Sequence, residues 1–400
     1  LSANSATFRT WPSIGYRTET ESRVLYGSFD GNGHLISGLY SDDADKDYTG
    51  VVGFGNCTIQ NLGLVDTYFK GKDYVGSICG YNVQGNILNC YSASSVAGTS
   101  HVGSICGYNY AGYIANCYYD NGKCATGGVD GADVSGQTAG KAADKFHNGE
   151  VAYLLSHADD ETWDYEVWGQ QLGTDLYPVG SDYKLVRAAL KPEDNTYWAT
   201  FSDQGDDITL SVPADRTLKV YNATVSSGTM TLTERADCQV ACEEGVLLKT
   251  DGEYVNAKAN EDYTLTPVAY AYNHLVATPY EPETIIADAG YKLYRLTYNN
   301  ASEKTGLGFY LGVVGSVKDG SQLKATPCKA YLKVASSETA NAQAFIFPEG
   351  GEVTAIEGIT FGGGQLSGTA GEDIYDLSGR KVSRAAHGLY IRNGKKVIIK

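Results

Sequence analysis

The chain has 400 residues and a formal net charge of −16, with 42% hydrophobic and 20% charged residues. This length suggests two or three domains, each with enough chain to bury a core. The acidic balance argues against nucleic-acid binding, which needs clustered Lys and Arg to displace counterions. The sequence contains no run of 18 apolar residues, so we expect no membrane span.

The first predicted element is a divergent repeat unit over residues 24–70. It contains Phe29-Asp-Gly-Asn-Gly-His, then Thr49-Gly-Val-Val-Gly-Phe and Ile59-Gln-Asn-Leu. Gly and Asn recur at the positions where the chain must turn, and both residue types are common at tight corners. We expect two or more short strands in this unit, separated by such corners.

The same unit carries an acidic loop with four aspartates. Because hard cations prefer clustered carboxylate oxygens, this loop is a candidate Ca²⁺ site. It lacks the central glycine and the distal glutamate of an EF-hand, so a solvated surface insertion is the favoured interpretation. We expect no other metal and no cofactor. The candidate ligands are Asp42, Asp43, Asp45 and Asp47.

Residues 71–97 and 98–124 are one unit written twice, with 14 of 27 aligned positions identical. The motif Val-Gly-Ser-Ile-Cys-Gly-Tyr-Asn begins at Val75 and again at Val102. The pattern alternates with a period of two, and no apolar stripe recurs every three or four residues. A fixed repeat of this length marks units that stack on one another, so we predict a parallel β-solenoid.

Cysteines recur with the repeat, as the equivalent pairs Cys79/Cys106 and Cys90/Cys117. Equivalent side chains in a solenoid lie about 4.8 Å apart and point the same way. A disulfide needs Cβ atoms about 3.5–4.5 Å apart and turned toward each other. We therefore predict free thiols packed in the core, with cross-linking inside a ladder as the alternative. The asparagines that recur at the corners are expected to form a ladder of side-chain hydrogen bonds.

After the second unit the repeat gives way to a glycine-rich stretch over 125–140. A helical pattern follows over 140–156, and a segment from Trp163 to Pro178 comes after it. We expect these two segments to cap the end of the solenoid, which would otherwise expose its core and unpaired backbone. The titratable side chains of the cap are expected to be solvated rather than catalytic: His147, Glu150, His157 and Glu161.

The remaining chain reads as β structure. Residues 189–358 contain short alternating segments separated by turn signals, which predicts an antiparallel β-sandwich. Gly362-Gly-Gly marks a linker, and 365–400 reads as a short β module. The predicted fold is all-β: a parallel β-solenoid (β-helix) with a helical cap over 1–188, then the sandwich, then the β tail.

The first module resembles the GLUG-repeat family, which occurs in bacterial surface proteins. The resemblance rests on the Phe29 motif, on Ile59-Gln-Asn-Leu, and on the two units that begin at Val75 and Val102. It covers about residues 24–180 and implies a solenoid architecture. The family carries no catalytic signature, so the resemblance implies no reaction.

Two further resemblances concern the rest of the chain. The sandwich resembles a β domain of Bacteroidetes surface proteins, through Val246-Leu-Leu-Lys and Gly308-Phe-Tyr. The segments that begin at Ile374 and Gly388 are similar to the C-terminal sorting domains of the type IX secretion family. Together they imply an exported cell-surface protein, anchored at the outer membrane by this tail or by an N-terminal segment ahead of Leu1.

Tyrosine is the main candidate for recognition. Stacked aromatic rings with polar tips suit a carbohydrate or a protein partner. The alternative is that these rings fill the corners of the solenoid. The candidates are Tyr81 and Tyr108, Tyr91 and Tyr118, and Tyr110 and Tyr113.

We therefore predict a non-enzymatic, monomeric adhesion or ligand-binding protein that binds a glycan or a protein on a host or neighbouring cell. One alternative is a solenoid polysaccharide lyase or hydrolase. Such an enzyme needs carboxylates or basic residues converging on one outer face, whereas these repeats supply Ser, Gly, Asn and Tyr. Another alternative is a structural stalk.

Overall fold

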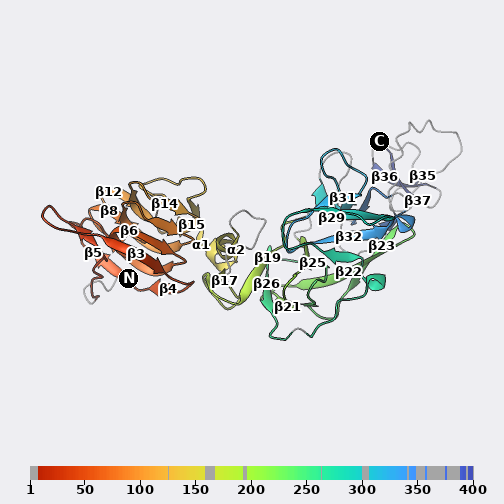
Figure 1. The fold of residues 1–400 in the computed structure, drawn as a ribbon, viewed down its shortest axis with the longest axis horizontal. Helices are drawn as coiled ribbons and strands as arrows, with labels where there is room; N and C mark the ends of the chain where they lie inside the picture. The colour runs from red at the N-terminus through yellow and green to blue at the C-terminus, as the bar shows by residue number, and fades with distance from the viewer. Residues whose placement is uncertain are drawn as a thin grey trace.

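The computed structural model describes residues 8–124, 126–157, 167–191, 196–262, 264–299, 306–339 and 342–347, together with four short strands near the C-terminus. These residues form a parallel β-solenoid of about four turns followed by stacked antiparallel sheets. The two parts lie at opposite ends of an elongated molecule, with two short helices between them (Figure 1). The predicted fold class is confirmed.

The solenoid begins after a small hairpin of β1 (Tyr16–Arg17) and β2 (Ser22–Arg23). Its strands, in chain order, are β3 (Leu25–Asp30), β4 (Leu35–Ser37), β5 (Tyr40–Asp42), β6 (Val52–Gln60), β7 (Gly63–Lys70), β8 (Asp73–Gly76), β9 (Cys79–Asn82), β10 (Asn86–Leu88), β11 (Tyr91–Ala97), β12 (Ser100–Gly103), β13 (Cys106–Asn109), β14 (Tyr113–Ala115), β15 (Cys117–Asp120) and β16 (Thr138–Lys141). Every pairing among them is parallel, which places the same repeat position of successive turns side by side.

The register of these strands confirms the alignment of the repeats. Cys106 lies beside Cys79 and Cys79 beside Val52, so the divergent first unit is in step with the later ones. Ile87 lies between Ile59 and Ile114 in the next row. The aliphatic and cysteine side chains of these rows form one continuous buried core. All nine cysteines are free, and for the pairs Cys79/Cys106 and Cys90/Cys117 this is what the stacking argument predicts.

A row of asparagines turns the chain at one corner of each rung. Asn61, Asn89 and Asn116 have φ of 52°, 55° and 50°, a left-handed conformation that Asn tolerates better than most residues. The Asn89 amide donates to Oδ1 of Asn61 at 2.9 Å, and the Asn116 amide donates to Oδ1 of Asn89 at 2.7 Å. The predicted asparagine ladder is confirmed.

The predicted helical cap is present as a minor element, made of α1 (Ala143–His147) and α2 (Glu150–Ser156). The helices and the chain after them run along one side of the solenoid, past its asparagine corner. Hydrogen bonds join this stretch to the fourth, third and first turns: Asn116 to Leu155 at 3.3 Å, Trp168 to Asn89 at 3.0 Å, and Gly180 to Gly33 at 2.8 Å.

The reason is an apolar patch on the outer wall of the solenoid. Its aromatic and small side chains point outward from β7 and β11, and the amphipathic helices bury them. The last turn is covered instead by residues 126–141, where Val129 forms a parallel bridge to Cys106 and β16 pairs with β15. The cluster under the helices contains Val65, Tyr91, Ala93, Phe146, Val151, Leu155 and Trp168. Trp163 lies outside the described residues.

The second part contains three stacked antiparallel sheets. The proximal sheet, next to the helices, has the order β19 (Tyr183–Arg187), β26 (Tyr254–Ala259), β21 (Ile208–Ser211), β24 (Gln239–Val240). The middle sheet has the order β20 (Tyr197–Phe201), β25 (Val246–Thr250), β22 (Leu218–Ser226), β23 (Thr229–Glu234), β34 (Ile356–Glu357). The distal sheet has the order β27 (Leu275–Ala277), β32 (Ala330–Ala335), β29 (Tyr291–Asn299), β30 (Gly306–Leu311), β33 (Ala344–Ile346).

The remaining elements are short. β17 (Trp168–Gly169) pairs with β18 (Val179–Gly180), and β28 (Thr284–Ile286) pairs with β31 (Gln322–Lys324). Two 3-10 turns span Tyr270–Tyr272 and Ser336–Glu338. Near the C-terminus, β35 (Ile374–Tyr375), β36 (Gly388–Arg392) and β37 (Lys395–Ile399) form an antiparallel sheet, so strands lie where the sequence predicts the β tail.

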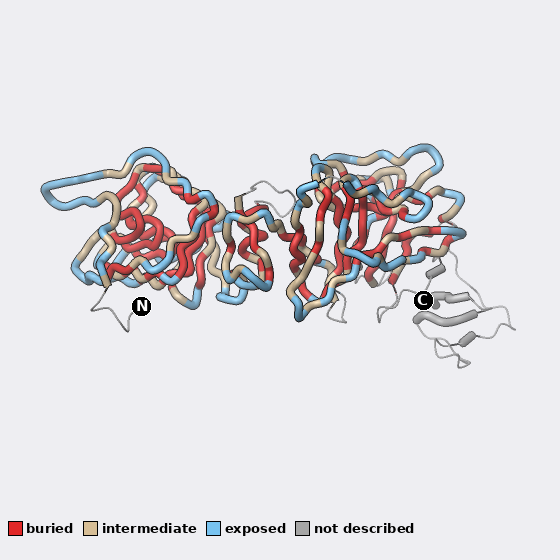
Figure 2. Tube along the Cα trace, turned by 90° about the horizontal axis from the view of Figure 1, so that it is seen from below, coloured by how far each residue is buried: buried red, intermediate tan, exposed pale blue. Residues whose placement is uncertain are grey.

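The middle sheet is buried on both faces, which explains its run of apolar residues. Successive side chains of a strand point to opposite faces. Val246 and Leu248 pack against the proximal sheet, and Leu247 between them packs against the distal sheet. All three are fully buried. Figure 2 shows the resulting layers of buried strand, with exposed residues at the loops and edges.

The sequence placed the boundary between the first two domains at 188/189, and the structure corrects this. β19 pairs with β26 over its whole length, from Tyr183 opposite Lys258 to Arg187 opposite Tyr254. This strand therefore belongs to the proximal sheet, and the second part begins before residue 183. The pairing joins residues about 70 positions apart, so local sequence could not reveal it.

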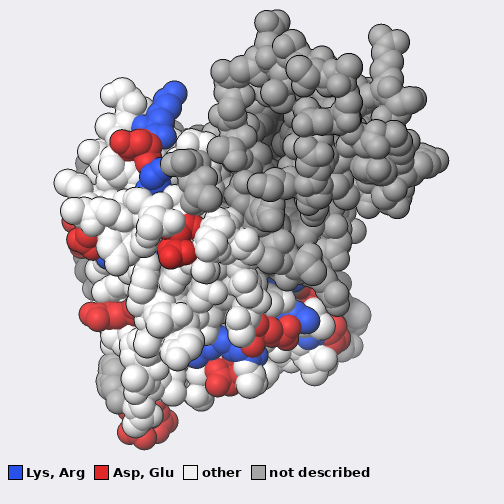
Figure 3. All heavy atoms as spheres, turned by 90° about the vertical axis from the view of Figure 1, so that its right-hand side faces the viewer, with Lys and Arg blue, Asp and Glu red and all other residues white. Residues whose placement is uncertain are grey.

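Two overall properties follow from the described residues. None of their helices is long and apolar enough to cross a membrane. On the end of the sandwich shown in Figure 3, acidic and basic side chains are interspersed among uncharged groups.

Candidate binding surface

Six aromatic side chains form two parallel rows, one along a corner of the solenoid and one on the wall beside it, and we call this surface the aromatic strip. One row contains one ring from each of three successive turns, at the corner before β6, β9 and β13. The other row lies on the adjacent wall, on β6, β9 and β13. The strip consists of Tyr48, Tyr74 and His101 in the corner row and Phe54, Tyr81 and Tyr108 in the wall row.

The corner row is a regular stack. The ring centroids of Tyr48 and Tyr74 are 5.0 Å apart with planes 8° from parallel. Those of Tyr74 and His101 are 4.8 Å apart with planes 4° from parallel. This spacing is that of neighbouring parallel strands, so the backbone register itself sets the stack. At its end, Nδ1 of His101 lies 2.9 Å from Oδ1 of Asp130.

The wall row packs against the corner row edge to face. Tyr81 lies between Phe54 and Tyr108, with centroids 5.2 Å from each. His101 meets Tyr108 at 4.8 Å and 78°, which is the T-shaped geometry that aromatic quadrupoles favour. The rings thus hold one another in fixed orientations.

The backbone of the corner row is left-handed. Tyr48, Tyr74 and His101 have φ of 59°, 60° and 50°, and Asp130 continues the row at 46°. A left-handed non-glycine residue costs roughly 1–2 kcal/mol, and each aromatic pair returns about 0.5–1.5 kcal/mol. Glycine would satisfy the same backbone without the cost. The corner geometry therefore does not require aromatic rings, which points to another reason for their presence.

The strip is partly open to solvent. Phe54 is buried at its base, and the other five side chains are half-buried. Burial raises the pKa of Tyr48 and of Tyr81, so both hydroxyls stay protonated and can donate hydrogen bonds at neutral pH. Stacking occupies most ring faces, so the edges and hydroxyls are the parts that a ligand can reach. The guanidinium of Arg17 lies 5.8 Å from the centre of the Phe54 ring.

The structure separates the six tyrosines that the sequence proposed. Tyr81 and Tyr108 belong to the strip. Tyr110 and Tyr113 are 64% and 61% exposed, just beyond it in the last turn. All four are on the surface, so they stay candidates.

Tyr91 is not a possible contact for a surface ligand, and this part of the prediction is wrong. Its side chain is fully buried under the helical segment, and its hydroxyl donates to the carbonyl of Pro178 at 2.8 Å. Tyr118, the next ring of that row, is half-buried, and its hydroxyl donates to Oδ1 of Asn116 at 2.8 Å. The row packs against the helices, rather than filling a corner of the solenoid as the alternative interpretation held.

In the acidic loop, the four aspartates do not converge on one point. Its carboxylates serve separate local contacts: Asp42 pairs with Lys70 at 3.0 Å, Asp43 accepts from the backbone of Asp45, and Asp47 accepts from the backbone of Asp73. Among the described residues, no three His, Cys, Asp or Glu side chains converge as metal ligands. The favoured reading as a surface insertion is consistent with this arrangement.

The titratable groups of the cap are only partly as expected. Glu150 forms ion pairs with Lys141 at 2.8 Å and with Lys145 at 3.0 Å. His157 is buried rather than solvated, with Nδ1 2.8 Å from the carbonyl oxygen of Tyr153 and its ring stacked on the Tyr153 ring. Glu161 lies outside the described residues.

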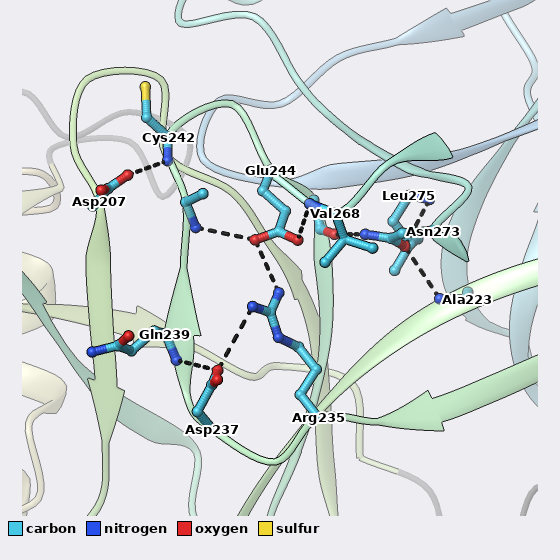
Figure 4. A network of polar contacts seen from close by, with 12 residues as sticks. Asp207, Ala223, Arg235, Asp237, Gln239, Cys242, Glu244, Val268, Asn273 and Leu275 are labelled. Carbon is cyan, nitrogen blue, oxygen red and sulfur yellow. Dashed lines mark hydrogen bonds and ion pairs between the residues drawn. The ribbon is translucent and has the colours of Figure 1, made fainter. Parts of the chain in front are cut away.

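A buried carboxylate in the sandwich also has a structural role. Glu244 forms a 2.9 Å ion pair with Arg235 and accepts hydrogen bonds from the backbone N–H groups of Ala241 and Val268 (Figure 4). Nearby, Asn273 donates to Gly245. These contacts fasten the chain after β26 to the middle sheet.

One histidine and one cysteine line the same small hollow, but they do not make a nucleophilic pair. His157 and Cys328 border a cavity of only about 20 Å³ between the helices and the sandwich. Burial raises the pKa of Cys328 to about 11, so its thiol is protonated at neutral pH. The hollow cannot admit a substrate.

Sequence reasoning missed the corner row. Tyr74 and His101 occupy the same repeat position, each directly before a valine. Tyr48 occupies this position in the first unit, where Thr49 pairs with Val75. The signal was present as a repeated aromatic position. The residues at this position are Tyr, Tyr and His, so residue identity between the repeats does not reveal it.

Comparison with known proteins adds no relative: no family model, no curated protein and no solved structure matches this chain.

Proposed function

We propose that this protein is a non-enzymatic adhesion or ligand-binding protein of the bacterial cell surface, whose aromatic strip contacts a glycan or a protein on a neighbouring cell. The observation that carries the proposal is the corner row of Tyr48, Tyr74 and His101. These rings occupy left-handed positions that glycine would fill at lower cost. Strain retained at an exposed surface is typical of functional sites.

The chemistry of the strip suits a repeating ligand. Its hydroxyls and ring edges recur once per turn, at the 4.8–5.0 Å spacing of the stacked rings. Tyrosine combines a large apolar area with a polar tip, which favours contact with sugars and with extended peptides. A linear glycan or peptide lying along the solenoid axis would meet the same groups at each turn.

A polysaccharide lyase or hydrolase is the competing enzyme hypothesis. The strip supplies aromatic rings and hydroxyls, and the carboxylates beside its corner row serve local contacts: Asp130 with His101, Asp73 with the Ser100 hydroxyl and Asp47 with the backbone of Asp73. Glycoside hydrolysis needs two carboxyl groups facing each other across the scissile bond. The strip therefore supports binding better than it supports this reaction.

A structural spacer is the second candidate, and one observation favours it. The helices pack against the solenoid through Phe146 and Leu155 and against the proximal sheet through Ala152 and Tyr153, where Leu172 of the following chain joins the same cluster. Different side chains of the helical segment thus contact the solenoid and the proximal sheet, which ties the solenoid and the sandwich together as an elongated body (Figure 1). Such coupling suits a protein that holds a binding site away from a surface.

Binding by full-length variants on a glycan array and to intact cells separates these candidates. The double variant Tyr81→Ala/Tyr108→Ala removes the open rings of the wall row, and Tyr272→Ala changes an exposed tyrosine of the sandwich that belongs to no candidate site. We expect the double variant to bind at least tenfold more weakly, about 1.4 kcal/mol, and the control to bind normally. Unchanged binding by the double variant would exclude the strip and favour the spacer. Turnover of an acidic polysaccharide would support the enzyme.

A further inference from the structure

The structure also contains an open trough on the proximal sheet, on the part of its outer face that the helices leave uncovered. The trough has a volume of about 420 Å³. The chain that follows the helices covers the neighbouring part of this sheet face, where the backbone N–H of Leu172 donates to Oδ1 of Asn256 at 2.9 Å. The trough is therefore on the sandwich, separate from the aromatic strip.

The floor of the trough is a single transverse row of side chains, one from each strand of the sheet. Tyr183 on β19 lies opposite Lys258 on β26, which lies opposite Thr209 on β21, which lies opposite Gln239 on β24. Adjacent strands are about 4.8 Å apart, so the row is about 14 Å long. A ring, an ammonium, a hydroxyl and an amide thus follow one another along an extended floor.

Neighbouring contacts hold these groups in place. The Thr209 hydroxyl donates to Oδ1 of Asn260 at 2.6 Å, which fixes an amide beside the floor. The ammonium of Lys258 lies 5.4 Å from the centre of the Tyr183 ring. The Gln239 side chain points away from the Arg235–Glu244 ion pair (Figure 4), and it is exposed.

The wall of the trough is formed by Asn260, Glu261, Asp262, Thr264 and Leu265, and Asp207 anchors both of its ends. The backbone N–H of Asn260 donates to the carbonyl of Asp207 at 2.8 Å, and that of Leu265 donates to its Oδ2 at 2.8 Å. The same carboxylate accepts from the backbone of Cys242 (Figure 4). Hydrogen bonds to Asp207 thus attach the wall to the sheet at both of its ends.

The charges of the lining select against anions. Its charged residues are one base, Lys258, and two acids, Glu261 and Asp262. The Lys258 ammonium already faces the Tyr183 ring, while both acids are exposed on the wall. A phosphate, a uronate or a sialylated glycan would meet net negative charge here. A neutral ligand would not.

We propose that this trough binds a short neutral oligosaccharide, as a second binding site independent of the aromatic strip. Amides and hydroxyls pair with the vicinal hydroxyls of a sugar as both donors and acceptors, and a tyrosine beside them supplies an apolar surface for the ring. The open, elongated floor accommodates a segment of a chain rather than one enclosed small molecule.

The test is calorimetric titration of the full-length protein with neutral tetra- to hexasaccharides of glucose, mannose, xylose and N-acetylglucosamine. Matched acidic chains are oligogalacturonate and hyaluronan fragments. We expect binding of at least one neutral chain and none of the acidic ones. Gln239→Ala should weaken that binding about tenfold, because it removes hydrogen bonds to the sugar.

Two controls make the result specific to the trough. Thr231→Ala changes an exposed residue on β23 of the middle sheet, and Tyr81→Ala/Tyr108→Ala disables the aromatic strip. Both should bind the neutral chain as the wild type does. The proposal is overturned if no neutral chain binds at millimolar concentration, if Gln239→Ala binds unchanged, or if the strip variant abolishes the binding. The last result would place the sugar on the strip and leave the proposed function intact.

Discussion

The hydroxyl of Tyr91 donates a hydrogen bond to the carbonyl of Pro178 at 2.8 Å, across 87 residues of sequence. The ring of Tyr91 also packs edge to face on Trp168, with centroids 5.4 Å apart. A residue that belongs to the repeat of the solenoid is thus buried by chain that follows the repeat. This contact decides how the helices attach, and it supplies a direct test of their role.

Replacing Tyr91 should destabilise the attachment of the helices in two separable steps. Tyr91→Phe removes only the hydrogen bond to Pro178 and should cost about 0.5–1.5 kcal/mol. Tyr91→Ala also leaves a cavity beside Trp168 and should cost about 3–5 kcal/mol. Chemical denaturation followed by tryptophan fluorescence measures both. Tyr113→Ala, at an exposed site, should change stability by less than about 0.5 kcal/mol; a larger effect there would mean that tyrosine loss is harmful regardless of burial.

The left-handed backbone at Tyr74 predicts different free energies of unfolding for two substitutions of this residue. Tyr74→Gly loses stacking but relieves the strained backbone at φ 60°, so its free energy of unfolding should stay within about 1 kcal/mol of the wild type. Tyr74→Ala loses the stacking and keeps the strain, so it should be about 1 kcal/mol less stable than Tyr74→Gly. Both should weaken ligand binding. Equal stability of the two variants would contradict the strain argument.

The solenoid thiols should resist alkylation in the folded protein. Hydrogen bonding with Cys106 and burial raise the pKa of Cys79, and burial together with Cys117 raises that of Cys90. Thiolate is the reactive form, so both should remain unmodified by iodoacetamide at pH 8 until the protein unfolds. Cys238 and Cys242 are less buried and should be labelled first. Peptide mass spectrometry over a time course measures the order, and early labelling of Cys79 would show that the solenoid opens.

The ion pairs of Glu150 should make the helices acid-sensitive. Burial raises the pKa of Glu150, but hydrogen bonds from Lys141 and Lys145 outweigh it and hold the pKa below 4.5. The stabilisation is therefore present above pH 4.5 and is lost as the pH falls through the lower folded-state value. Glu150→Gln should destabilise the protein at pH 7 by about 1 kcal/mol or less, and the difference from wild type should vanish in acid. Thermal melts at pH 7 and pH 3 measure this, with Glu19→Gln as an exposed control that should show no such trend.

Much of the solenoid was predictable because its determinants are local and repeated. The pairing of Cys79 with Cys106 and the stacking of Asn89 on Asn116 follow from a spacing of 27 residues, since equivalent positions in stacked parallel strands must lie side by side. The free thiols follow from the same geometry. The GLUG-repeat and sorting-tail resemblances, and the cell-surface location they imply, stay predictions.

The site was only half predictable. Tyr81 and Tyr108 recur as identical residues and were identified, but Tyr91 and Tyr118 recur in the same way and proved to be packing residues. Repetition shows which side chains share a row. It does not show whether another segment covers that row, because the covering helices are held by contacts between residues far apart in sequence.

The sequence by itself determined the all-β class, the stacking of the repeats and the interior position of their Ile and Cys rows, because period and alternation act between neighbours along the chain. Only the tertiary structure decided where the helices lie, that β19 joins the second part, and that three sheets stack so that Leu247 is buried between two of them. Those outcomes depend on which apolar faces meet. Burial of apolar surface is not directional, so local sequence leaves open which face meets which.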